Sequence, residues 1–137
     1  MYDKKFVGLQ HARAAVDAVL ALANEHSERP IVVAVSDPEG ELVAFARMDG
    51  AGYLSRSMAQ RKAYTAARMG ADSGVFGERM SGVVPSVHDL DDPKLVGFKG
   101  GVCITLDGAI IGGIGVSGRS GEEDEELARA AVSEVFG

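Results

Sequence analysis

The sequence predicts a single α+β domain in which helices cover an antiparallel sheet. Two observations predict this class: two β-branched runs each return on themselves through a short turn, and other stretches carry apolar residues at helical spacing. Strands joined by short turns form hairpins, so the sheet is at least partly antiparallel. The length of 137 residues fits one domain spanning residues 1–137.

The first half of the chain predicts a helix, a hairpin and a second helix. Residues 9–26 place apolar side chains on one face at 3.6-residue spacing. The β-branched run 31–35, the turn sequence SDPEG and the run 41–48 predict the hairpin. Residues 52–70 predict the second helix, which we expect to end at Gly70 because glycine favours the conformation of a helix C-cap.

The second half predicts a short helix, a loop, a second hairpin and a final helix. Residues 72–80 predict the short helix, and the Pro, Gly and Asp content of 81–94 predicts the loop. GVCITL and AIIGGIGV flank the Asp-Gly pair 107–108, which is typical of a type I′ turn. The final helix, 122–136, begins with EEDEE, and we expect Asp124 or the adjacent glutamates to cap it.

Composition excludes several classes of protein. The chain is 46% hydrophobic and 25% charged, as in ordinary folded domains. The net charge of -6 argues against a nucleic-acid partner, because phosphate binding needs clustered Lys and Arg. No apolar stretch approaches a membrane span, and the N-terminus lacks the pattern of a signal peptide. The single cysteine, Cys103, forms no intramolecular disulfide, so we expect a cytoplasmic protein.

The glycine-rich stretch GGIGVSG, residues 112–118, raises the question of a phosphate site. Gly113, Gly115 and Gly118 have dinucleotide-motif spacing, but they follow a hairpin instead of opening a βαβ unit, and no P-loop lysine follows them. Glycine inside a strand marks close approach of another group. Two alternatives follow for Gly113 and Gly115: a helix or subunit packs on them, or a ligand lies there. The two are compatible if the strand passes under a helix and then opens into a pocket at GVSG.

Five polar residues could carry chemistry in the first half of the chain. Arg47 and Asp49 end the second strand, where Asp-Gly is also a simple turn signal. In the functional alternative, they line a pocket and Arg47 holds a carboxylate or propionate. Lys62 and Tyr64 diverge on the second helix, whereas Thr65 can share the face of Lys62.

Ser117 and the histidines are the remaining candidates. Ser117 could be a nucleophile, but the sequence fixes no histidine near it; alternatively its hydroxyl binds a polar ligand group or caps the loop. His11 lies off the apolar face of the first helix, so it is solvated or faces a ligand or partner subunit. His26 suits the negative end of the helix dipole, and His88 lies in the long loop. No zinc-type histidine pair exists, so we predict no metal site of that kind.

Taken in order, three motifs resemble the GlcG/HbpS family of small haem-binding-type proteins, which includes the C-terminal domain of PduO-type adenosyltransferases. The motifs are ARMDGA at 46–51, RKAYTA at 61–66, and GGVCITLDGAIIGGIGVSG at 100–118 followed by EEDEELA. The resemblance covers nearly the whole chain and implies a profilin-like α/β/α domain with a five-stranded antiparallel sheet. It also implies a homo-oligomer, often an octamer in the family. Some members bind haem, and many are encoded among catabolic genes.

The resemblance makes His11 the first candidate for a haem ligand. We therefore expect a cytoplasmic homo-oligomer that binds a small organic ligand, with haem or a related tetrapyrrole as the first candidate. The expected ligand-binding residues are His11, Arg47, Asp49, Thr65, Gly115 and Ser117. The alternative is a catabolic enzyme of lyase or isomerase type that acts on a small carboxylated metabolite, with Asp49, Lys62 or Tyr64 in proton transfer. A structural or regulatory protein, the third class, would need no polar pocket.

Overall fold

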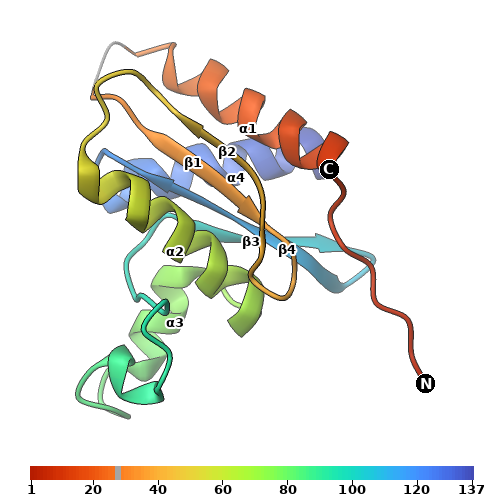
Figure 1. Cartoon of the computed structure of the whole chain (residues 1–137), viewed down its shortest axis with the longest axis vertical. Helices are drawn as coiled ribbons and strands as arrows, with labels where there is room; N and C mark the ends of the chain where they lie inside the picture. The colour runs from red at the N-terminus through yellow and green to blue at the C-terminus, as the bar shows by residue number, and fades with distance from the viewer. Residues whose placement is uncertain (27–28) are drawn as a thin grey trace.

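The structure, a computed structural model, describes residues 1–26 and 29–137 and has three layers (Figure 1). The middle layer is a four-stranded sheet. Helices α1 (Leu9–Ala23) and α4 (Gly121–Phe136) cover one face, and α2 (Tyr53–Met69) covers the other. Within the described residues, no helix is long and apolar enough to cross a membrane.

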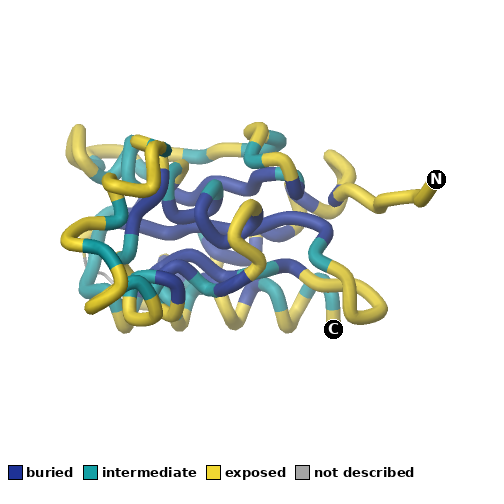
Figure 2. The backbone as a smooth tube through the Cα atoms, turned by 90° about the horizontal axis from the view of Figure 1, so that it is seen from below, coloured by how far each residue is buried: buried dark blue, intermediate teal, exposed yellow. Residues whose placement is uncertain are grey.

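The sheet is antiparallel throughout and has the order β2-β1-β4-β3. Its strands are β1 (Val32–Ser36), β2 (Leu42–Arg47), β3 (Gly101–Leu106) and β4 (Ala109–Ser117). The two central strands, β1 and β4, are the most deeply buried, whereas the edge strand β2 is largely exposed or half-buried. Figure 2 shows the buried residues gathered in the middle of the molecule. The short helix α3 (Ser73–Met80) and the 3-10 turn η1 (Val87–Leu90) lie between α2 and β3 in the chain.

Both predicted hairpins are confirmed. Asp107 and Gly108 have φ angles of 51° and 80°, as a type I′ turn requires at both central positions. In the first hairpin, a carboxylate oxygen of Asp37 accepts the backbone N–H groups of Glu39 and Glu41. These turns pin the two pairs of neighbouring strands, and β1 then joins β4 at the centre of the sheet.

The number of strands differs from the five that the family resemblance implied, because the described residues form four. The N-terminal segment comes closest to a fifth: Val7 donates its backbone N–H to the carbonyl of Ile111 at 2.8 Å. This bond lies just beyond the end of β1, where Ser36 pairs with Gly113. One backbone hydrogen bond does not define a strand. The predicted loop 81–94 contains turns, η1 and an isolated β-bridge, and it adds no strand to the sheet.

Helix ends also differ in detail from the sequence prediction. Helix α1 ends at Ala23, before the predicted position 26, and α2 ends as predicted with Gly70 in the left-handed conformation. At the start of α4, Ser120 is the cap: its hydroxyl accepts the N–H of Glu123, and the Glu123 carboxylate accepts the N–H of Ser120. Glu123 is one of the expected glutamates, but Asp124 has another role, described below.

Helix α2 lies directly on the backbone of β3 and β4. A Cβ atom at Gly115 would collide with the carbonyl of Ala59 and lie 2.6 Å from the nitrogen of Ala63. A Cβ at Gly113 would lie 2.5 Å from the carbonyl of Ala63. Gly101, which pairs with Gly115, is equally close to α2. Of the two alternatives for Gly113 and Gly115, the structure shows packing of a helix, which is α2.

This packing predicts the effect of a side chain at Gly115. Gly115→Val should lower the free energy of unfolding by about 1–3 kcal/mol, because the added atoms force α2 away from the sheet. That change corresponds to a drop of several degrees in Tm by thermal denaturation. Gly8→Val is the control, because a Cβ at Gly8 meets no atom within 4 Å. Equal Tm values for the parent and the Gly115 variant would contradict the close packing.

Candidate functional site

An apolar cleft lies where the N-terminal segment, α1 and the end of α4 meet the β3–β4 hairpin. Its volume is about 410 Å³. The cleft is lined by Lys5, Phe6, Val7, Gly8, His11, Leu106, Ile111, Val135 and Phe136. The walls are mainly aliphatic and aromatic, and Phe6 and Leu106 are 46% and 40% exposed. Such an open apolar surface beside a few polar groups is typical of a site for an organic ligand.

His11 is the titratable group of this cleft that can coordinate a metal. It is exposed on α1, one helical turn before the buried Ala15, at the border of the buried face of the helix. Its ring centroid is 6.0 Å from that of Phe136, with an interplanar angle of 32°. The His11 imidazole makes no hydrogen bond or ion pair with any described residue, so both ring nitrogens are available to a ligand.

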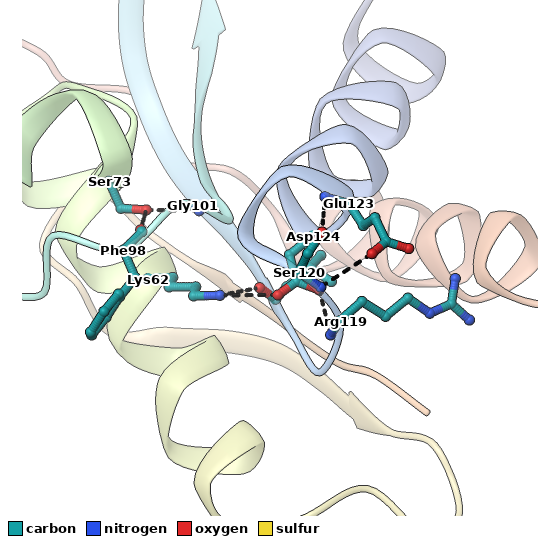
Figure 3. A network of polar contacts seen from close by, with 9 residues as sticks. Lys62, Ser73, Phe98, Gly101, Arg119, Ser120, Glu123 and Asp124 are labelled. Atoms are coloured by element: carbon teal, nitrogen blue, oxygen red, sulfur yellow. Dashed lines mark hydrogen bonds and ion pairs between the residues drawn. The ribbon is translucent and has the colours of Figure 1, made fainter. Parts of the chain in front are cut away.

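A buried ion pair connects α2 with α4 on the other side of the sheet (Figure 3). Lys62 Nζ lies 3.3 Å from Asp124 Oδ2 and donates to the carbonyl of Val116 at 2.9 Å. The two side chains are only 5% and 2% exposed. The second carboxylate oxygen of Asp124 accepts the N–H of Arg119 at 3.0 Å. Because both oxygens of Asp124 are used, its carboxylate is fixed within the fold.

Burial dominates the electrostatics of this pair. It lowers the pKa of Lys62, although the charge of Asp124 opposes the shift. Burial likewise raises the pKa of Asp124 against the opposing charge of Lys62. Lys62 therefore compensates a buried carboxylate, and it lines none of the cavities near His11, Tyr64 or His88.

Arg119 extends the same network to the end of α1. Its guanidinium donates to the carbonyls of Ala23, His26 and Arg29, at 2.9, 3.2 and 3.0 Å. Carbonyl groups at a helix C-terminus lack partners within the helix, so these bonds satisfy part of that deficit. The turn before α4 therefore holds α1 and α2 in fixed positions.

Tyr64 lies in a second groove, on the opposite side of the sheet from His11. Its hydroxyl donates to Asp92 at 2.7 Å. The cationic groups of Arg68 and Lys94 lie 5.3 and 5.4 Å from the ring centroid. Burial and the bond to Asp92 raise the pKa of Tyr64, so the neutral phenol persists and is a poor proton acceptor. This environment favours a role for Tyr64 as a hydrogen-bond donor.

The other predicted ligand residues are dispersed. Thr65 is fully buried and its hydroxyl accepts the backbone N–H of Val96 at 3.0 Å. Gly115 lies beneath α2, and Ser117 is 8% exposed at the end of β4. These three residues line neither the His11 cleft nor the Tyr64 groove. Their participation in ligand binding stays a prediction, and the structure supplies a packing role for Thr65 and Gly115.

Arg47 and Asp49 are exposed at the end of β2. Asp49 lies in a turn in which Ala51 donates its N–H to the carbonyl of Met48 at 3.1 Å, and Gly50 has a φ of 84°. The simple turn explanation for the Asp-Gly pair therefore applies.

Across residues 1–26 and 29–137, no three His, Cys, Asp or Glu side chains form a group that could hold a metal ion by themselves.

Sequence reasoning missed the walls of the cleft and the partner of Lys62. Phe6 and Phe136 lie near opposite ends of the chain, and only the tertiary fold brings them together. For Asp124 the sequence predicts only a helix-capping role, as an alternative to the adjacent glutamates. Its burial could not be predicted, because the partner lies 62 residues away and on another helix.

The buried pair predicts a large and asymmetric effect on stability. Lys62→Met should lower the free energy of unfolding by about 3–5 kcal/mol, because Asp124 is left charged and buried. The double variant Lys62→Met/Asp124→Leu should recover much of that loss in denaturant unfolding. As a control, Lys99→Met removes the exposed Lys99–Glu122 pair and should cost at most about 1 kcal/mol. A Lys62 variant as stable as the control variant would contradict the structural role.

Known proteins of similar sequence and structure share this fold. The family model described as "Haem degrading protein HbpS-like" matches residues 7–133. The corrinoid adenosyltransferase PduO of Salmonella typhimurium LT2 is 33% identical over 132 residues, which covers 92% of this chain. That match takes in only 37% of PduO, so this chain spans little more than a third of its relative's length.

Two solved structures extend the comparison over the fold. A double mutant of HbpS from Streptomyces reticuli is 33% identical, with a TM-score of 0.89, and the match covers 98% of this chain and 90% of that one. The PduOC:haem complex is 27% identical, with a TM-score of 0.85 and coverage of 93% and 94%. The predicted family resemblance is confirmed by these matches. The chain therefore belongs to the family described as "Haem degrading protein HbpS-like".

Proposed function

We propose that this protein is a cytoplasmic homo-oligomer that binds haem in the cleft beside His11. The observation that carries the proposal is an apolar cleft in which an exposed imidazole has no hydrogen-bond partner among the described residues. The haem complex of the structurally similar PduOC and the haem-degrading description of the family support the choice of ligand.

The residues of the cleft fit the chemistry of haem. A flat apolar macrocycle needs aromatic and aliphatic walls, which Phe6, Ile111 and Phe136 supply. Its iron needs a nitrogen ligand, which His11 supplies. Its propionates need a cation at the rim, and Lys5 lines the same cleft. The cleft is open, so a bound haem would keep one edge in water.

Each of these side chains has a distinct role in the proposed complex. His11 would coordinate through a ring nitrogen in its neutral form, and contact with Phe136 limits rotation of the imidazole. Lys5 would orient the ligand, and the apolar walls would exclude water from one face. Haem, when bound, supplies iron-centred redox chemistry.

Other potential ligands of the iron are less suitable. Burial and the nearby charge of Asp72 raise the pKa of the Cys103 thiol to about 12, so the thiolate is not formed at neutral pH. The thiol donates to the carbonyl of Ala66 at 3.3 Å. His88 lines a separate polar cavity with Arg61 and Asp91.

The enzymatic alternative, proton transfer on a small carboxylated metabolite, has weaker support. It needs a proton acceptor next to a cavity, whereas Lys62 is committed to Asp124 and Tyr64 holds its proton. Asp49 lies in an exposed turn away from the cleft walls. Haem binding therefore remains the preferred function.

Haem titration of the parent and of His11→Ala tests the proposal. We expect the parent to give a shifted Soret band, and His11→Ala to change that band and weaken binding by about tenfold or more, because one coordinate bond is lost. His88→Ala is the matched control, since it removes a histidine outside the cleft. An unchanged spectrum and affinity in His11→Ala would overturn the assignment.

The oligomeric part of the proposal is supported by exposed apolar side chains on β2 and the start of α2. Phe45 and Leu54 are 38% and 69% exposed and line none of the cavities near His11, Tyr64 or His88. Clusters of this kind commonly mark subunit contacts. Light scattering at micromolar concentration should give a mass above that of a dimer, that is, more than twice 14.3 kDa. A monomer under those conditions would contradict this part of the proposal.

A further inference from the structure

The groove beside Tyr64 is independent of the haem cleft. It lies between the first hairpin and the outer face of α2, has a volume of about 560 Å³, and shares no lining residue with the cleft of His11. Its lining residues are Ser36, Gly40, Glu41, Leu42, Tyr53, Arg56, Ser57, Gln60, Arg61, Tyr64 and Lys94. We propose that this groove binds a small organic anion with two or more negative charges on carboxylate or phosphate groups.

The charge of the groove is opposite to that of the whole chain. Arg56, Arg61 and Lys94 line it, and Glu41 is the one acidic residue among its lining residues, whereas the chain carries a net charge of -6. Among the described residues, none of these three cations takes part in an ion pair. A concave surface that gathers unpaired cations concentrates anions from solution.

Arg56 brings an unsatisfied hydrogen-bond donor to the groove. Its Nε is buried and has no hydrogen-bond partner. In the described part of the chain, no other buried side-chain nitrogen or oxygen lacks one. Its guanidinium lies 5.5 Å from the ring centroid of Tyr53, which limits its orientation. A buried unpaired N–H is costly, and a carboxylate that binds the Nε edge of a guanidinium would satisfy it.

The helix places the other polar groups on the same surface. Arg56, Gln60 and Tyr64 follow one another at four-residue spacing along α2, and Ser57 and Arg61 form the adjacent row. All five line the groove, so the helix face itself is one wall. A ligand along this wall can meet both arginines, which is why we infer at least two anionic groups.

Lys94 closes the groove from a loop that is tied to α2. The hydroxyl of Tyr64 donates to Asp92 Oδ2, and the backbone N–H of Lys94 donates to Asp92 Oδ1 at 3.1 Å. The ammonium group of Lys94 lies 5.4 Å from the Tyr64 ring centroid. These contacts hold the cation in position before a ligand arrives, which lowers the entropic cost of binding.

Calorimetric titration of the full chain tests the proposal with three probes. Citrate carries several carboxylates, inorganic phosphate tests the phosphate source, and acetate is the monovalent control. We expect citrate or phosphate to bind with 1:1 stoichiometry per chain and acetate to bind at least about tenfold more weakly. High salt should weaken binding, because it screens the charges.

Variants distinguish the groove from general surface charge. Arg56→Gln and Arg61→Gln should each weaken binding of the preferred probe by about tenfold or more. Arg13→Gln, an exposed arginine on α1 outside the groove, should leave the affinity unchanged. Thermal denaturation of all three proteins establishes that they are folded.

Three outcomes would overturn the proposal. The first is no binding of citrate or phosphate above that of acetate. The second is an equal effect of Arg13→Gln and Arg56→Gln, which means nonspecific attraction. The third is a lower oligomer mass for Arg56→Gln or Arg61→Gln, with no probe binding to the parent, which means that a second copy of the chain covers the groove. Haem titration of the same variants is expected to match the parent, so failure at this groove leaves the His11 assignment intact.

Discussion

The close approach of α2 to the sheet determines the positions of most other elements. With no side chains at Gly101, Gly113 and Gly115, the backbone of the helix rests on that of β3 and β4. The same gap lets Lys62 pass the end of the sheet and reach Asp124 on α4, and a Cβ atom at Gly100 would lie 2.7 Å from its Nζ. One helix is thereby connected to the layer on the opposite face. A larger residue at Gly113 or Gly115 would force the helix away from the sheet.

The two candidate sites follow from that arrangement. Because Asp124 and Arg119 hold the start of α4, the last turn of the helix brings Phe136 beside His11 on α1. On the other face, the inner side of α2 is committed to the sheet, so its outer side is left to form the groove with the first hairpin. The apolar cleft and the cationic groove therefore lie on separate surfaces and favour different ligands.

Local features of the sequence predicted the elements well, since turns and helical periodicity depend on neighbouring residues. The Asp107-Gly108 turn and the Gly70 helix end are examples, and the glycines of β4 correctly indicated the close approach of another group, which the structure shows to be α2. The fifth strand implied by the family was wrong for the described residues. The surroundings of the predicted site residues were harder to predict. Thr65 is buried and accepts the backbone N–H of Val96, and Lys62 pairs with the carboxylate of Asp124 on another helix. Such partners depend on the tertiary fold, and neither spacing nor composition encodes them.

A crystal structure of the protein with haem tests the proposed site most directly. We expect iron bonded to a ring nitrogen of His11, with the macrocycle against Phe136 and Ile111 and a propionate near Lys5. We also expect the Lys62–Asp124 pair and the contact of α2 with Gly115 to be unchanged by the ligand. Haem bound elsewhere, whether in the groove of Tyr64 or between subunits without His11, would contradict the proposed function.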